Sequence, residues 1–235
     1  LPLSTPGPTM PVLTDVDALR DVAAGRVPPQ VARRDKLVAL RAQAMDLVRE
    51  QGLLQTRASW RIVPLDGEPG EAGSLCMDGQ RLQAPWLVPS SGRLTAVACA
   101  VATIGDALEQ HVGELFAQRR AALGVALDSL GNELLFALSR RVQDRLWAEA
   151  RKQGLTVAGE LRAGDPGLQL QAQHTVLQLA GAADIGVALT RTLMMNPTKS
   201  TSIVQGVGLA LPEQTWSRCD HCRSRERCNL VKNAA

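Results

Sequence analysis

The leucine-rich stretch between residues 125 and 153 restricts the fold more than any other part of the sequence. Its large apolar residues recur every three or four positions, and they are Leu127, Leu130, Leu134, Leu138, Val142 and Leu146. This spacing places them on one face of an amphipathic helix. Gly154 follows the stretch, and glycine is favoured just after a helix ends. A helix this long buries its apolar face only against another layer, which the rest of the chain must supply.

Strand patterns on both sides of this helix supply that layer. Residues 93–103 are nearly all apolar, which predicts a central strand, and residues 57–63 predict another strand before a turn-rich segment. The same reasoning predicts further strands at 157–161, 187–194 and 201–211 and further helices at 31–50, 105–122 and 171–179. Together the patterns predict an α+β fold, a largely antiparallel twisted sheet with helices packed on one side.

The chain divides into three parts by composition. Its 235 residues are enough for one sizeable core. Prolines crowd residues 1–29, so we expect a peripheral N-terminal arm there with one short helix near 16–24. The α+β domain is expected over 30–212. A charged tail with a cysteine cluster follows over 213–235.

The charge and aromatic content exclude several classes of partner. The 26 basic and 23 acidic residues are interleaved along most of the chain, which has no Tyr and two Phe. Nucleic-acid binders concentrate basic charge, and single-strand binders stack bases on aromatic rings.

The longest apolar run, at 96–102, is far shorter than the about 20 residues that span a bilayer. No secretory signal pattern opens the sequence. We therefore expect a cytoplasmic protein that binds neither nucleic acid nor membrane.

Three of the five cysteines, Cys219, Cys222 and Cys228, lie within ten residues near the C-terminus. An odd, clustered set argues against a disulfide framework. Three thiolates in one short segment can converge on a soft metal or an iron–sulfur cluster, and the arginines between them offset the negative charge. The spacing predicts an iron–sulfur cluster, with zinc as the alternative. It leaves the fourth ligand open among Cys76, a substrate or cofactor at an open cluster site, and His221 if the site holds zinc.

Two loops carry residues suited to a small ligand. The first runs from Glu160 to Leu168, directly after a predicted strand. Its glycines let a ligand approach the backbone, and Arg162 offers a fork of donors to a carboxylate. The second is the polar segment 194–202 between two apolar strands, and its own pattern predicts only a hairpin loop.

Sequence signatures of other common sites do not occur. Gly206 and Gly208 lie in a strand pattern without the third glycine of a dinucleotide fingerprint, and there is no Walker-type phosphate loop. The three histidines are scattered, and none suggests a catalytic triad.

Several segments, taken in order, resemble the activation domain of vitamin B12-dependent methionine synthase. They are Ala102–Gly105, the two helices after it, Arg162 with the Pro166-Gly167 turn, Gln171–Gln173, the turn Met195–Ser200 and the closing cysteines. The resemblance covers roughly residues 30–232 and is strongest to stand-alone members that carry a C-terminal cysteine cluster.

The resemblance implies a C-shaped α+β domain that binds S-adenosylmethionine in a shallow groove. Arg162 would meet the methionine carboxylate, and Leu168 stands where the family has tyrosine. The implied cofactor site consists of Arg162, Gly164, Pro166, Gly167, Leu168, Asn196, Lys199 and Ser200.

The implied role is that of an accessory or reactivation subunit of a corrinoid-dependent methyltransferase system. It would support reductive methylation of cob(II)alamin. The corrinoid would be held by a partner, because the chain has no Asp-x-His-x-x-Gly corrinoid fingerprint. An iron–sulfur cluster can supply a low-potential electron, and the cobalt makes the new bond, so the protein needs to supply orientation and electrostatics. The alternatives are a non-enzymatic module that docks a corrinoid protein and holds a structural zinc, and a small enzyme with an unrelated substrate.

Overall fold

The computed structural model describes residues 11–212, which divide into two compact units. Among these residues, unit 1 contains 11–61, 100–146 and 177–202, and unit 2 contains 62–99, 147–176 and 203–212. The chain passes from one unit to the other within three strands and two helices. Each unit is described by itself.

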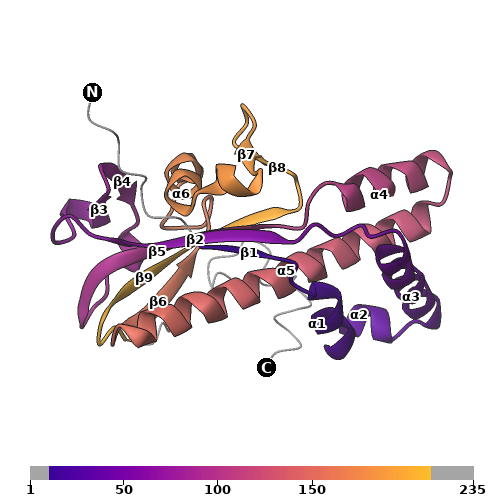
Figure 1. The fold of residues 1–235 in the computed structure, drawn as a ribbon, viewed down its shortest axis with the longest axis horizontal. Coiled ribbons are helices and arrows are strands. Elements are labelled where there is room, and N and C mark those ends of the chain that lie inside the picture. The colour runs from indigo at the N-terminus through magenta and orange to yellow at the C-terminus, as the bar shows by residue number, and fades with distance from the viewer. Residues whose placement is uncertain (1–10, 213–235) are drawn as a thin grey trace. The chain divides into compact units, whose positions relative to one another are not determined.

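The main sheet has five strands in the order β1, β2, β5, β9, β6 (Figure 1). Their bounds are Val12–Thr14 for β1, Arg57–Pro64 for β2, Arg93–Thr103 for β5, Ser200–Leu209 for β9 and Thr156–Leu161 for β6. β1 pairs with β2, and β6 with β9, in antiparallel fashion. β5 lies in the middle of the sheet and is buried from Ala96 to Thr103, as its apolar run predicts. The predicted α+β fold with a mainly antiparallel sheet is confirmed.

Two short hairpins accompany the main sheet. In unit 2, β3 (Ser74–Met77) pairs with β4 (Gln80–Gln83) in the turn-rich segment between β2 and β5. In unit 1, β7 (Ala188–Leu189) pairs with β8 (Met195–Asn196).

The strand predicted over 187–194 is therefore wrong for most of its length. The chain turns back between Thr190 and Met194, where the Met194 N–H donates to Thr190 Oγ1 at 3.1 Å. This side-chain hydrogen bond competes with a continued strand. The hairpin turn thus lies earlier than predicted, and Met195 and Asn196 belong to its second strand.

The helices follow the predicted periodicity closely. They are α1 (Ala18–Ala24), α2 (Pro29–Ala32), α3 (Asp35–Glu50), α4 (Ala107–Ala117), α5 (Ala121–Lys152) and α6 (Gln173–Ala180). Short 3₁₀ turns are η1 (Glu71–Gly73), η2 (Pro85–Leu87), η3 (Leu170–Ala172) and η4 (Ala182–Ile185). The helix predicted over 31–50 is interrupted at Arg33 and Arg34, and its first part begins at Pro29, a residue favoured in the first helical turn.

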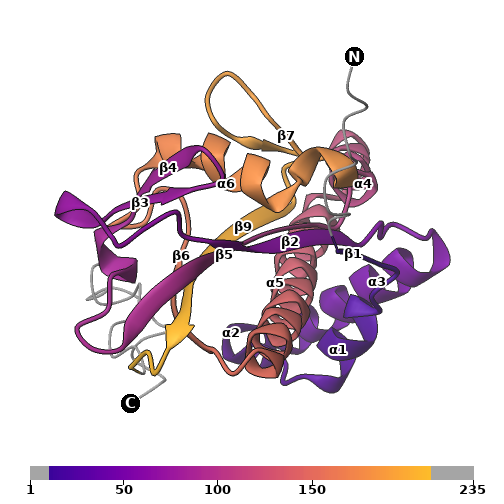
Figure 2. The ribbon, with the colours of Figure 1, turned by 60° about the vertical axis from the view of Figure 1, so that its left-hand side comes forward.

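The apolar stripe of α5 forms much of the core of unit 1. All six of its large residues have no exposed surface. By length and composition α5 also passes for a membrane span, but half of its most apolar window is buried inside the protein, as in a core helix. In unit 1, α1 and α3 lie beside α5 (Figure 2).

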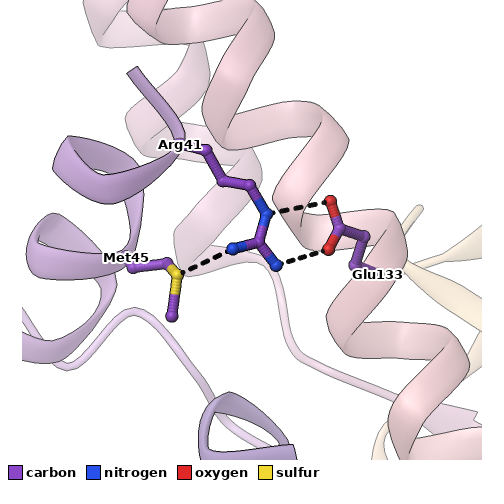
Figure 3. A network of polar contacts seen from close by, with 3 residues as sticks. All are labelled: Arg41, Met45 and Glu133. Atoms are coloured by element: carbon purple, nitrogen blue, oxygen red, sulfur yellow. Dashed lines mark hydrogen bonds and ion pairs between the residues drawn. The ribbon is translucent and has the colours of Figure 1, made fainter. Parts of the chain in front are cut away.

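A partly buried ion pair fixes α3 against α5 in unit 1 (Figure 3). Arg41 Nη2 donates to Glu133 Oε2 at 2.8 Å, and Nη1 approaches the Met45 sulfur at 3.2 Å. The Arg41 side chain is only 11% exposed. Low exposure weakens solvent screening, so the pair restricts how the two helices pack.

The proline-rich segment before residue 30 contributes to unit 1. β1 is the edge strand beside β2, and α1 begins after Asp17, whose Oδ1 accepts from the Arg20 N–H at 2.9 Å. Ala18 and Val22 are buried. The short helix predicted near 16–24 is confirmed.

Candidate functional site

The turn after β6 is braced by its own hydrogen bonds. The Arg162 N–H donates to Asp165 Oδ2 at 2.9 Å, and the Asp165 N–H donates to the Arg162 carbonyl at 2.8 Å. The Leu168 N–H donates to the Asp165 carbonyl at 3.0 Å, and the Gly164 N–H donates to the Leu168 carbonyl at 2.9 Å. Aspartate favours turns because its carboxylate accepts from nearby backbone N–H groups. The protein's own groups thus satisfy much of the polar backbone of this turn.

Glu160 orients the Arg162 side chain at the start of the turn. Arg162 Nη2 and Nε donate to the same oxygen, Glu160 Oε1, at 3.0 and 3.3 Å. The Arg162 side chain is 19% exposed. A partly buried guanidinium held in this way is a preorganised donor for a carboxylate.

Two glycines give the turn its shape. Gly164 and Gly167 have φ values of +95° and +85°, which side chains rarely adopt. Gly167 also lies against Trp86, so closely that a Cβ there would come within 2.6 Å of the Trp86 ring. A Cβ at Gly164 would have Leu170 Cδ1 as its nearest atom, at 3.7 Å, which is ordinary contact. Gly167 is therefore required by packing as well as by backbone conformation.

A cavity of about 510 Å³ lies beside this turn in unit 2. It is lined by Gln83, Pro85 and all residues from Gly164 to Gln171. Small-molecule sites typically enclose about 300–1,000 Å³. Leu168 is only 1% exposed, so its side chain adds almost no surface to the lining. The exposed lining is more apolar than polar, and one aspartate and three glutamines add polar groups to it.

Lys199 lies in unit 1, where its ammonium is held by three oxygens. Lys199 Nζ is 2.8 Å from both Asp128 Oδ1 and Asn132 Oδ1, and 3.3 Å from the Asp128 carbonyl. An ammonium has three N–H donors, so these acceptors can use all of them. Lys199 is 8% exposed. We refer to Lys199, Asp128 and Asn132 as the lysine clamp, which fixes the residue before β9 to α5.

Ser200 and Asn196 have different surroundings within unit 1. Ser200 Oγ lies 2.9 Å from Thr103 Oγ1 and donates to the Pro197 carbonyl at 2.6 Å. Thr103 Oγ1 also accepts from the Gly105 N–H at 3.1 Å. Asn196 is exposed on β8. The polar atoms of Lys199 and Ser200 are thus engaged by the protein itself.

The predicted ligand residues fall into two groups. The structure brings Gly164, Pro166, Gly167 and Leu168 together around the cavity, with Arg162 two residues before it. Lys199 and Ser200 lie together in unit 1, and the two groups belong to different units.

Sequence reasoning missed several residues that define these environments. Asp128 and Asn132 are four apart, a spacing that places both on one helix face and that was readable from the sequence. Glu160 is two residues from Arg162, the same-side spacing of extended chain. Pro85 and Trp86 approach the turn from more than seventy residues away, so no local pattern pointed to them.

The predicted metal ligands Cys219, Cys222 and Cys228 lie outside the described residues. Within residues 11–212, no group of three or more His, Cys, Asp or Glu side chains is arranged to hold a metal. Of the two cysteines in that part of the chain, Cys99 is buried and Cys76 is exposed.

Comparison with known proteins identifies the fold. No protein-family model matches the chain, and a search of curated proteins gives no match. A solved structure described as the MetH reactivation domain bound to AdoHcy is similar, with a TM-score of 0.62 over 95% of this chain and 87% of that one. The two sequences are 13% identical, so the likeness establishes the fold alone. The predicted activation-domain-like fold is thereby confirmed.

Proposed function

We propose that this protein binds S-adenosylmethionine and its product AdoHcy in the cavity beside the turn after β6. The observation that carries the proposal is the likeness to a reactivation domain bound to AdoHcy, which extends over 95% of the chain. A shared fold does not by itself transfer a ligand, so the proposal also depends on local chemistry.

The local chemistry suits the amino-acid end of such a ligand. The guanidinium of Arg162, oriented by Glu160, is a donor for the ligand's carboxylate. Asp165, in the cavity lining, carries a carboxylate that can attract an ammonium group. The two positive-φ glycines allow the rest of the ligand to approach the backbone.

Calorimetric titration of the full chain with AdoHcy tests this proposal. Arg162→Ala should weaken binding by about 1.5–3 kcal/mol, or roughly ten- to 150-fold, because a charged hydrogen bond is lost. Arg93→Ala is the matched control, since Arg93 is also paired with a glutamate in unit 2 but is exposed. It should leave the affinity unchanged. Absence of AdoHcy binding to the unaltered protein, or equal binding by the Arg162 variant, contradicts the assignment.

We further propose that the protein supports reductive methylation of cob(II)alamin held by a corrinoid-binding partner. The support is the same fold likeness together with the absence of a corrinoid fingerprint in this chain. S-adenosylmethionine would supply the methyl group, and this chain's residues would bind and orient it. A cluster on Cys219, Cys222 and Cys228 would supply the electron.

Metal and sulfide analysis after anaerobic purification tests the cluster. Cys222→Ser should lower iron and acid-labile sulfide together and leave the far-ultraviolet circular dichroism unchanged. Cys76→Ser, which removes an exposed thiol from β3, is the control for cysteine loss. Stoichiometric zinc without sulfide would instead support the alternative, a corrinoid-docking module with a structural zinc.

A further inference from the structure

Unit 1 contains a charged cavity that shares no lining residue with the lysine clamp or the turn after β6. It encloses about 580 Å³ between α5, the end of α1 and the loop that leads to α2. Its α5 wall carries positions three or four apart, so one helix face lines it. The lining residues are Asp21, Val22, Gly25, Arg26, Pro28, Glu133, Phe136, Ala137, Arg140, Arg141 and Asp144.

Two of the three carboxylates in this lining are already neutralised by arginines. Asp21 accepts from Arg141 Nε at 2.7 Å and from Nη2 at 2.6 Å. Glu133 is held by Arg41 from α3, as Figure 3 shows. Paired hydrogen bonds of this kind fix the relative orientation of the two side chains. Asp144 is the carboxylate that remains.

Two arginines of the lining have no such partner. Within residues 11–212, the side chains of Arg26 and Arg140 form no hydrogen bond or salt bridge, and Arg140 acts on the Asp21 carboxylate only through its charge. They come from different elements, Arg26 from the loop after α1 and Arg140 from α5. After the two pairs are counted, the charge facing the cavity is two positive groups against one negative group.

The remaining lining is apolar. Val22 and Ala137 are buried beside the cavity, and Phe136 is 48% exposed, which is unusual for a phenylalanine on a core helix. Pro28 adds a rigid apolar surface in the loop. Such a wall favours a planar or apolar body.

We propose that this cavity binds a small organic anion, with an aromatic or apolar body against Val22, Phe136 and Ala137 and a phosphate or carboxylate between Arg26 and Arg140. Arginine forks recognise both anionic groups by paired hydrogen bonds. The Asp21–Arg141 pair fixes one end of the cavity. The site shares no residue with the proposed AdoHcy site, and the proposal does not depend on it.

Titration calorimetry with matched probes tests the site on the full chain. Adenosine 5′-monophosphate and indole-3-acetate carry a phosphate and a carboxylate, and adenosine and indole-3-acetamide are their neutral counterparts. At least one anion should bind about tenfold tighter than its neutral counterpart, and the anion that does so identifies the preferred group. Failure of both anions to bind at about 1 mM overturns the proposal.

Substitutions place the binding in this cavity. Arg26→Gln and Arg140→Gln should each weaken anion binding about tenfold. Arg145→Gln, on the same helix but in the lining of a neighbouring cavity, should change it by less than about twofold. Arg162→Ala should leave anion binding intact. If Arg162→Ala abolishes it, the anion occupies the AdoHcy site and the proposal fails; if none of the arginine changes matters, it fails as well.

Discussion

The turn after β6 and the lysine clamp contain the same kinds of residues, but they differ in what surrounds the cation. Both contain a cation beside a carboxylate, and sequence reasoning assigned both to one ligand site. In unit 1, the protein's own oxygens surround the Lys199 ammonium, which is 8% exposed. In unit 2, the turn beside Arg162 satisfies its own backbone and still borders a cavity of about 510 Å³. The difference separates a cation that the protein's own oxygens surround from one that lies two residues before a cavity lining.

The largest expected effect is the loss of stability when the lysine clamp is removed. Lys199→Ala should lower the free energy of unfolding by about 2–4 kcal/mol, because it removes charged hydrogen bonds and buried side-chain volume. Urea unfolding measures this change. Lys36→Ala, at an exposed position of α3, should cost less than about 0.5 kcal/mol. A Lys199→Ala variant that keeps its stability but no longer binds AdoHcy would show that Lys199 serves the ligand and not the fold.

The next largest effect concerns Gly167 in the turn after β6. Gly167→Ala should cost about 1–3 kcal/mol, because alanine is strained at a φ of +85° and its Cβ would meet Trp86. Gly164→Ala has the same backbone strain without that contact and should cost less. Thermal unfolding of both variants compares them. Equal losses would show that the Trp86 contact does not restrict the turn.

A smaller effect is expected at Ser200. Ser200→Ala removes the hydrogen bonds to Thr103 and to the Pro197 carbonyl and should cost about 1 kcal/mol. AdoHcy affinity should not change, since the Ser200 hydroxyl serves the protein. A loss of affinity at unchanged stability would return Ser200 to the ligand site.

The smallest effect concerns an ion pair more exposed than the lysine clamp. The hydrogen bond from Arg141 holds the pKa of Asp21 below its ordinary value of 3.8. A carboxyl whose folded-state pKa is lowered stabilises the protein above its unfolded pKa, and that stabilisation is lost as pH falls through the folded pKa. Asp21→Asn should cost at most about 1 kcal/mol at neutral pH and weaken the fall in stability below about pH 4. An unchanged acid transition would show that Asp21 does not contribute to it.

Regular elements were predictable because their signals are local. The leucine spacing of α5 and the apolar run of β5 gave nearly correct bounds and the central place of β5. The strand prediction over 187–194 was wrong because Val187 to Leu189 are strand-like, whereas hydrogen bonds of the Thr190 backbone and hydroxyl turn the chain after them. The periodicity of apolar residues does not predict a hydrogen bond from a side chain to the backbone.

The candidate site was predictable in part. The turn that follows Arg162 is made by consecutive residues, so the sequence indicated it directly. The partners of Lys199 lie 67 and 71 residues earlier in the chain. No local pattern shows that such a lysine is neutralised within the protein.

Hydrogen–deuterium exchange with and without AdoHcy tests most directly whether the turn after β6 is the binding site. We predict that amides of residues 162–171 exchange more slowly with AdoHcy present, while those of 128–132 and 199–201 keep their rates. Protection confined to the lysine clamp, or no protection in either region, would contradict this assignment.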